Sequence, residues 1–140
     1  MTGSLLNAIE LAVTQAQANI FEKTGAMELD SENFIRFFMN SETCRQLDMN
    51  YSHMCFAGEA YIMEELLDEG KNRIIKSSDT FSGDELHWIG YIYRYWHYYT
   101  GESSAEIYKQ ADAKALKAVY PAYHTLDCRL AVDRIKEANA

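Results

Sequence analysis

The stretch from Ser82 to Gly101 constrains the fold most, because it places seven aromatic residues between a helix start signal and a helix stop signal. It reads S-G-D-E-L-H-W-I-G-Y-I-Y-R-Y-W-H-Y-Y-T-G. Ser82 and Glu85 have the spacing of a capping box, and Gly101 is typical of the residue that ends a helix. We therefore predict a helix over about residues 82–100.

The alternative interpretation of this stretch is a β-strand, since tyrosine, tryptophan and isoleucine favour strands. Length decides between the two, because strands rarely exceed about ten residues. A helix that is aromatic nearly all round is usually surrounded by other elements, so we expect it at the centre of the molecule. The second interpretation is that some of its tyrosines line a groove or a partner surface, where their amphipathic rings make good contacts.

The rest of the chain is typical of one helical domain over residues 1–140. With 48% hydrophobic residues it can bury a core, and a single proline with seven glycines is too few breakers for many short strands. We predict an all-α fold of five to seven helices around the aromatic one. Helical spacing and capping residues suggest further helical segments at about 4–22, 30–39, 42–47, 52–69, 103–111, 112–120 and 127–138.

Three details of these segments are specific expectations. Ser4 is the expected cap of the first helix and Gly25 its end. Phe56 is expected to begin the apolar stripe of one long helix from Ser52 to about Glu69. Pro121 lacks an N–H group, so the helix there should bend or stop.

The acidic residues are concentrated in the first half of the chain. Residues 1–70 hold 12 acidic and 3 basic residues, whereas residues 71–140 hold 9 and 10, within a total net charge of −8. Such a surface serves solubility, and it also attracts a basic protein partner. Four acidic residues near the end of the segment 52–69 form an acidic rim. Their negative charge is unfavourable at the C-terminal end of a helix, where it opposes the helix dipole. The residues of this rim are Glu64, Glu65, Asp68 and Glu69.

Several classes of function find no support in the sequence. No apolar run reaches 18 residues and the start of the chain is unlike a signal peptide, so we expect no membrane contact. The three cysteines lack C-x-x-C spacing, which favours free thiols in a reducing, cytoplasmic compartment. No histidine or cysteine grouping has the four ligands of a structural zinc site, so we expect neither a metal nor a cofactor.

Two other functions remain as alternatives. Residues 103–120 resemble a helix-turn-helix that would offer Lys114 and Lys117 to DNA, but the acidic chain argues against a nucleic-acid surface. An enzyme could use His87 or His97 as an acid–base group. No nucleophile or cofactor cradle accompanies either histidine, so we assign no catalytic residue and expect no enzyme.

Three phrases in the second half carry a family resemblance: W-I-G-Y-I-Y-R-Y-W at 88–96, T-G-E-S-S-A-E-I-Y at 100–108 and Y-P-A-Y-H-T-L-D at 120–127. They resemble small uncharacterised bacterial helical proteins encoded beside genes of toxin-like proteins, some of which resemble ADP-ribosyltransferases. The similarity covers about residues 82–138. It implies an antitoxin-like or accessory member of a toxin–antitoxin module, and it transfers no catalytic residue.

The leading hypothesis is therefore a non-catalytic protein-binding module, with a basic toxin as its partner. The acidic rim would steer the partner, and exposed aromatic residues of the central helix would anchor it. Self-association into a homo-oligomer stays open. The expected anchor residues are Tyr91, Arg94, Tyr95 and Tyr98.

Overall fold

The computed structural model describes residues 6–50 and 52–139, and throughout these ranges the regular structure is helical apart from one isolated bridge between Leu29 and Lys76. The all-α prediction is confirmed. The described chain forms the α-helices α1 (Ala8–Ala26), α2 (Ser31–Met39), α3 (Glu42–Asp48), α4 (Glu59–Glu69), α5 (Gly83–Thr100), α6 (Ser104–Gln110), α7 (Ala113–Tyr123) and α8 (Cys128–Ala138), together with the 3-10 helix η2 (His53–Phe56).

The number of α-helices exceeds the expected five to seven. One reason is that the segment of residues 42–47, expected to add only a turn or two, is a separate helix with its own cap, Ser41, whose side chain accepts from the Cys44 N–H. The prediction of one long helix from residue 52 is also wrong, because Gly58 has a φ of +88° and separates η2 from α4. Phe56 consequently leaves the core stripe and is 60% exposed.

The capping signals of the aromatic helix are confirmed. The Ser82 hydroxyl accepts a hydrogen bond from the Glu85 N–H, and the Glu85 carboxylate accepts one from the Ser82 N–H. Gly101 ends α5 with a φ of +81°, a conformation that glycine adopts without strain. Asp112 and Asp127 are the observed caps of α7 and α8, as predicted. For α2 and α6 the sequence left two candidates each, Asp30 or Ser31 and Ser103 or Ser104, and the observed caps are Asp30 and Ser103.

Three boundaries differ from expectation or fall outside the description. Ser4 lies outside the described residues, and α1 begins after Asn7, which forms a capping box with Glu10. Gly25 does not end α1, which continues to Ala26. Pro121 lies inside α7 without ending it, since the helix stops only two residues later at Tyr123.

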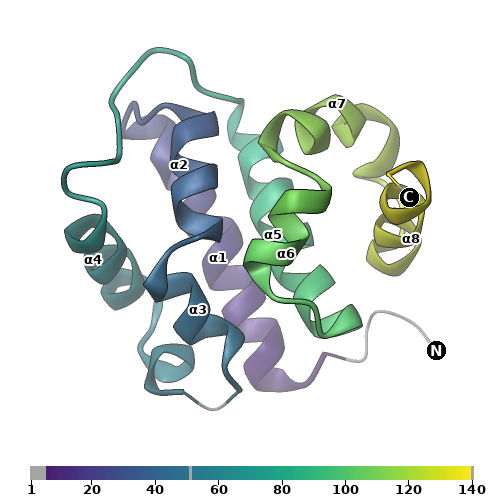
Figure 1. Cartoon of the computed structure of the whole chain (residues 1–140), viewed down its shortest axis with the longest axis horizontal. Helices are drawn as coiled ribbons and strands as arrows, with labels where there is room; N and C mark the ends of the chain where they lie inside the picture. Colours follow the sequence, from purple (N-terminus) through teal and green to yellow (C-terminus); the bar gives the residue numbers. More distant parts are fainter. Residues whose placement is uncertain (1–5, 51, 140) are drawn as a thin grey trace.

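The aromatic helix α5 packs lengthwise against α1, and this antiparallel pair is the most extensive helix contact. A Cβ atom at Gly90 would lie 2.9 Å from the backbone oxygen of Gln17 and 3.0 Å from the Cα of Ala18. Only glycine permits so close an approach, and the Gln17 side chain uses it to donate a hydrogen bond to the Gly90 carbonyl. The pair lies behind α2, α3 and α6 in Figure 1, with α4 and α8 at opposite edges.

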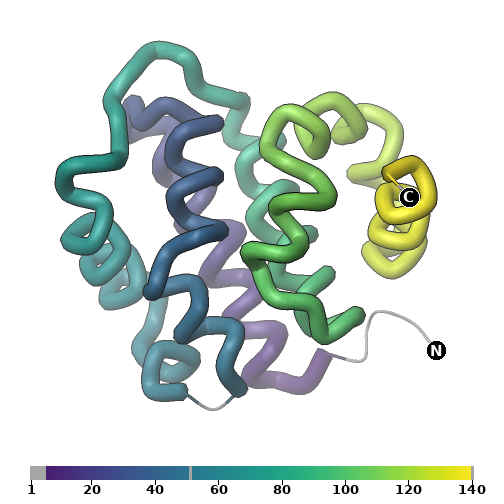
Figure 2. Tube along the Cα trace, viewed as in Figure 1, coloured from purple at the N-terminus to yellow at the C-terminus, as the bar shows by residue number. Residues whose placement is uncertain are grey.

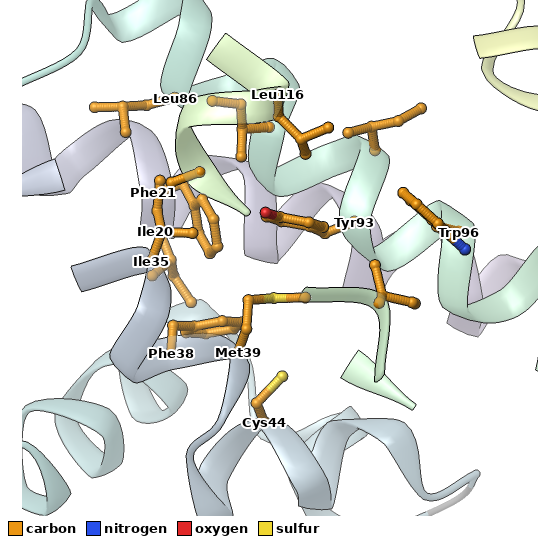
Figure 3. Packing of buried hydrophobic residues seen from close by; sticks show 14 of the residues in the cluster. Ile20, Phe21, Ile35, Phe38, Met39, Cys44, Leu86, Tyr93, Trp96 and Leu116 are labelled. Atoms are coloured by element: carbon orange, nitrogen blue, oxygen red, sulfur yellow. The ribbon is translucent and has the colours of Figure 1, made fainter. Parts of the chain in front are cut away.

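The main core fills the space between this pair and α2, as the close-up in Figure 3 shows. The Phe21 ring of α1 meets the α2 rings of Phe34 and Phe38 edge to face, at centroid distances of 5.6 and 4.9 Å. Tyr93 of α5 is fully buried, and its hydroxyl donates to the Ala111 carbonyl at 2.7 Å. The central position predicted for α5 is therefore observed. Figure 2 follows the chain as it returns through α6, α7 and α8.

No helix within the described ranges has the length and apolar character that crossing a membrane requires.

Candidate functional site

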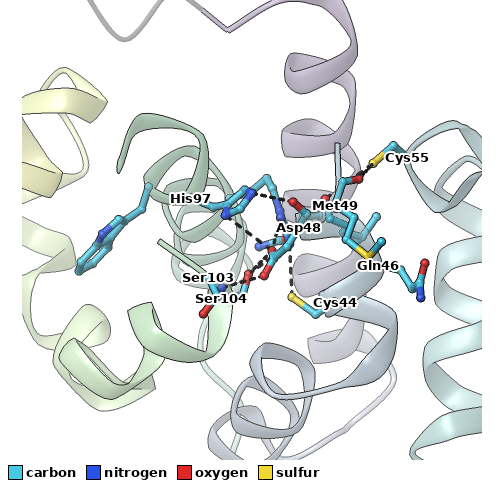
Figure 4. Close-up of polar contacts among 12 residues, drawn as sticks. Cys44, Gln46, Asp48, Met49, Cys55, His97, Ser103 and Ser104 are labelled. Carbon is cyan, nitrogen blue, oxygen red and sulfur yellow. Dashed lines mark hydrogen bonds and ion pairs between the residues drawn. The ribbon is translucent and has the colours of Figure 1, made fainter. Parts of the chain in front are cut away.

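A polar cluster in the interior is centred on the buried Arg94. Figure 4 shows its members Cys44, Asp48, His97 and Ser104. The Arg94 side chain has no exposed surface, yet its guanidinium reaches α1, α3 and α6. Its Nε donates to Gln17 Oε1 at 2.8 Å and its Nη1 to Asp48 Oδ1 at 2.7 Å. The other terminal nitrogen, Nη2, lies 3.3 Å from Cys44 Sγ and 3.4 Å from Ser104 Oγ. The Arg94 cluster therefore joins four helices.

Asp48 is the counter-ion in this cluster, at the end of α3. It accepts hydrogen bonds from the Ser104 hydroxyl at 2.7 Å and from the Ser104 N–H at 2.8 Å, at the start of α6. Burial by itself would raise the pKa of Asp48. The Arg94 guanidinium and the Ser104 hydrogen bonds together lower the pKa by more than burial raises it, so the net pKa shift is downward. The carboxylate is thus held in its charged form.

His97 closes the cluster on the side of the α5–α6 loop. Its Nδ1 lies 2.6 Å from the Glu102 carbonyl oxygen, and its Nε2 lies 3.1 Å from the Asp48 carbonyl oxygen. The Asp48 carboxylate oxygen Oδ1 lies 3.9 Å from His97 Nδ1.

The groups in this cluster stabilise the packing of the helices and include no reactive nucleophile. Burial raises the pKa of the Cys44 thiol to about 11, although the neighbouring Arg94 acts in the opposite direction. The thiol therefore stays protonated and is a poor nucleophile. The polar atoms around Arg94 use one another as partners, which is the arrangement that makes burial of a charge tolerable.

The residues predicted to anchor a partner from α5 differ in exposure. Arg94 is completely buried and Tyr95 is 3% exposed, so burial removes both as contact residues of the folded surface. Tyr98 is half-buried against Arg94, whose guanidinium lies 5.9 Å from its ring centroid. Tyr91 is half-buried, and the nearby Cys128 of α8 helps to raise its pKa, after burial itself. Only Tyr91 and Tyr98 keep accessible surface.

Tyr95 also lacks a hydrogen-bond partner for its buried hydroxyl within the described residues. Its ring stacks on Tyr99 at a centroid distance of 5.9 Å, and Tyr99 in turn donates to Asp133 of α8. Burial raises the pKa of Tyr95 to about 12. These contacts place Tyr95 in the α5–α8 interface.

The acidic residues predicted on α4 divide into two groups. Glu69 is structural, because its carboxylate accepts hydrogen bonds from the backbone N–H groups of Glu42 and Thr43 at the start of α3. Glu64 and Asp68 are exposed and Glu65 is half-buried. None of these three takes part in an ion pair with another described residue.

Two exposed aromatic residues, one on α4 and one in the η2 segment before it, were not predicted from the sequence. Tyr61 is 40% exposed and Phe56 is 60% exposed. Tyr61, Glu64, Glu65 and Asp68 are spaced at i, i+3, i+4 and i+7, and they therefore share one side of α4. Gly58, two residues after Phe56, was the available signal that Phe56 would not continue the helical stripe. We define the α4 face as Tyr61, Glu64, Glu65 and Asp68 of α4, together with the exposed Phe56 of the preceding 3-10 helix η2.

The structure places two of the predicted tyrosines, Tyr91 and Tyr95, away from the acidic rim, whereas Tyr98 lies beside Cys55 of η2. Tyr91 and Tyr95 belong to the side of α5 near α8, whereas α4 packs on α1 and α3 at the opposite edge (Figure 1). A partner that used Tyr91 together with the acidic rim would have to contact two opposite edges of the molecule.

The two histidines of the enzyme hypothesis and the two lysines of the DNA-binding hypothesis lie in four different surroundings. His87 is half-buried and faces Glu22 at 2.9 Å, while His97 belongs to the Arg94 cluster. Lys114 is exposed on α7, and Lys117 lies 3.8 Å from Glu85 and over the Phe81 ring. Within the described chain, no three histidine, cysteine or acidic side chains are grouped so that they could hold a metal ion.

Comparisons of the chain with known protein families, with curated proteins and with solved structures found no match.

Proposed function

We propose that this chain is a non-catalytic module that binds a basic protein through the α4 face. The observation that supports it most is the grouping, on one side of α4, of the exposed Tyr61 ring with three carboxylates that form no ion pair within the described residues. Exposed aromatic residues supply contact area, and a field of one sign speeds the encounter with a partner of the opposite sign.

The energetics of α4 support this assignment. Glu64, Glu65 and Asp68 lie toward the C-terminal half of the helix, where negative charge is unfavourable. For Glu69, the hydrogen bonds that its carboxylate accepts at the start of α3 offset this unfavourable interaction with the helix dipole. The other three carboxylates have no such partner among the described residues. A basic partner would supply the missing counter-charge.

We further propose that the basic partner is a toxin. The resemblance of residues 82–138 to proteins encoded beside toxin genes supports a toxin as the basic partner, with this chain as its antitoxin-like companion in the cytoplasm. Tyr91 and Tyr98, which keep partial exposure, remain candidates for a secondary contact.

The test is an affinity purification of the tagged chain from its own cells, with identification of any stoichiometric partner. The charge-reversed variant Glu64→Lys/Asp68→Lys should lose the partner, and Phe56→Ala should weaken binding. The control Glu28→Lys/Glu137→Lys changes the net charge equally at two exposed positions away from α4, and it should retain the partner.

Each step of the proposal has its own contrary result. An acidic partner, or one retained equally by both charge-reversed variants, would exclude the α4 face as the binding surface. Expression of the identified partner alone, without this chain, tests the toxin assignment. Normal growth under that condition would contradict an antitoxin role while leaving the binding function intact.

A further inference from the structure

A second surface feature has the opposite charge. A hollow of about 330 Å³ lies between α2 and the segment that follows α4. Its lining residues are Asn33, Arg36, Phe37, Asn40 and Arg73. Two of the five are arginines, one from each half of the chain.

The walls of the hollow are held by specific contacts. The Asn33 side chain donates to the Arg73 carbonyl at 3.1 Å and accepts from the Ile75 N–H at 2.8 Å, which fixes the segment after α4 against α2. The Arg73 guanidinium lies over the Phe37 ring, 5.1 Å from its centroid. The hollow is therefore a built feature rather than a gap between unconnected segments.

The two guanidinium groups keep their hydrogen-bonding capacity. Neither Arg36 nor Arg73 forms an ion pair with a carboxylate in the described part of the chain. Arg36 lies in the last turn of α2, where the helix dipole favours a cation. That effect accounts for the charge at this position but uses none of the N–H donors, of which each guanidinium has five.

We propose that this hollow binds a phosphate-type oxyanion. A guanidinium presents its N–H groups in a planar fork that matches the oxygens of phosphate or carboxylate. Two such groups at one hollow match the charge of a phosphate dianion better than that of a single carboxylate. The proposal is independent of the α4 face, because the hollow has the opposite charge and its own lining residues.

The experiment is a titration of the whole chain with inorganic phosphate at constant ionic strength, followed by NMR of the arginine Nε–Hε groups and the backbone amides. We expect saturable shifts at Arg36 and Arg73. Arg36→Gln and Arg73→Gln should each weaken phosphate binding at least about tenfold, since a hydrogen bond to a charged group contributes about 1.5–3 kcal/mol. Dispersed amide spectra would verify that both variants fold.

Matched controls make the result decisive. Arg45→Gln removes an exposed arginine that is already paired with Glu42, so it should leave phosphate affinity unchanged. The α4 variant Glu64→Lys/Asp68→Lys should also retain phosphate binding, which separates this proposal from the proposed function. Shifts that chloride reproduces, affinity that survives both Arg→Gln changes, or acetate binding as tight as phosphate would each overturn the assignment.

Discussion

The Arg94 cluster and the α4 face carry the same kinds of charged group in opposite circumstances. In the cluster, Asp48 and Arg94 are almost completely enclosed, and each has several partners. On the α4 face, Glu64 and Asp68 are exposed, and no cation lies within ion-pair distance among the described residues. One region thus satisfies its charges internally, whereas the other leaves them available.

The difference shows that charge alone does not mark a functional residue. Arg94 lies in the aromatic helix and was predicted to face a partner, yet its partners are Gln17, Asp48, Cys44 and Ser104 of this same chain. Breaking a buried ion pair costs much folding stability, but the pair is not available to bind a partner. An exposed carboxylate contributes little to folding stability, but it speeds the encounter with a partner of opposite charge. Mutations should therefore affect folding in one region and binding in the other.

The largest expected effect is the loss of stability in Arg94→Met. This change leaves the Asp48 carboxylate enclosed without its cation, so the free energy of unfolding should fall by about 3–5 kcal/mol. Urea denaturation measures it. Arg45→Met, at an exposed pair with Glu42, should leave the midpoint almost unchanged. Equal, small effects of the two substitutions would remove the distinction between the regions.

A second prediction concerns the helix crossing that positions the cluster. Gly90→Ala puts a methyl group about 3 Å from the α1 backbone and should destabilise the protein by about 1–3 kcal/mol. Gly83→Ala is the matched control, because its added methyl would meet Glu22 only at an ordinary contact of 3.8 Å. Thermal unfolding of both variants measures the difference. A stable Gly90→Ala variant would show that the α1–α5 contact is looser than described.

The sequence was sufficient where local signals and tertiary contacts agree. The capping residues gave the start of α5, α6, α7 and α8, and the length of the aromatic stretch correctly favoured a central helix. The break at Gly58 was missed because the apolar spacing from Phe56 to Leu67 suits one continuous helix.

The Arg94 cluster could not be predicted in the same way. Its members come from four helices, and their meeting depends on the register between α1 and α5. Gly90, one turn before Arg94, was the one local indication that this side of α5 approaches another helix closely. For the α4 face, the acidic composition was visible in the sequence, but the exposure of Tyr61 and Phe56 depends on the packing.

A third prediction compares two tyrosines inside the buried region. Tyr93→Phe loses a hydrogen bond to the Ala111 carbonyl and should lower the free energy of unfolding by about 1 kcal/mol. Tyr95→Phe removes a buried hydroxyl without a described partner, so it should leave stability unchanged or raise it by about 1 kcal/mol. Urea denaturation of the pair measures both. A clear loss in Tyr95→Phe would reveal a partner for its hydroxyl.

A fourth prediction uses pH. Glu102 accepts hydrogen bonds from Trp96 and Lys136; although burial opposes ionisation, these contacts lower its pKa to about 2. A carboxyl whose pKa is lower in the folded state stabilises the protein above its unfolded pKa of about 4.3, and this contribution is lost as the pH falls toward about 2. Glu102→Gln should therefore show a shallower loss of stability with acid, whereas exposed Glu137→Gln should follow the wild type. Urea midpoints at several pH values decide between these outcomes.

The smallest expected effect lies on the α4 face, and its sign is informative. Glu64→Lys/Asp68→Lys replaces negative by positive charge toward the C-terminus of α4, where the helix dipole favours cations. The free energy of unfolding should rise by about 0.5 kcal/mol, and a thermal melt at low salt should show it while high salt reduces it. A variant that is more stable and yet binds no partner would show that these carboxylates serve binding at a cost in stability. A destabilised variant would instead mean that Glu64 or Asp68 contributes to folding, and the contrast between the two regions would then fail.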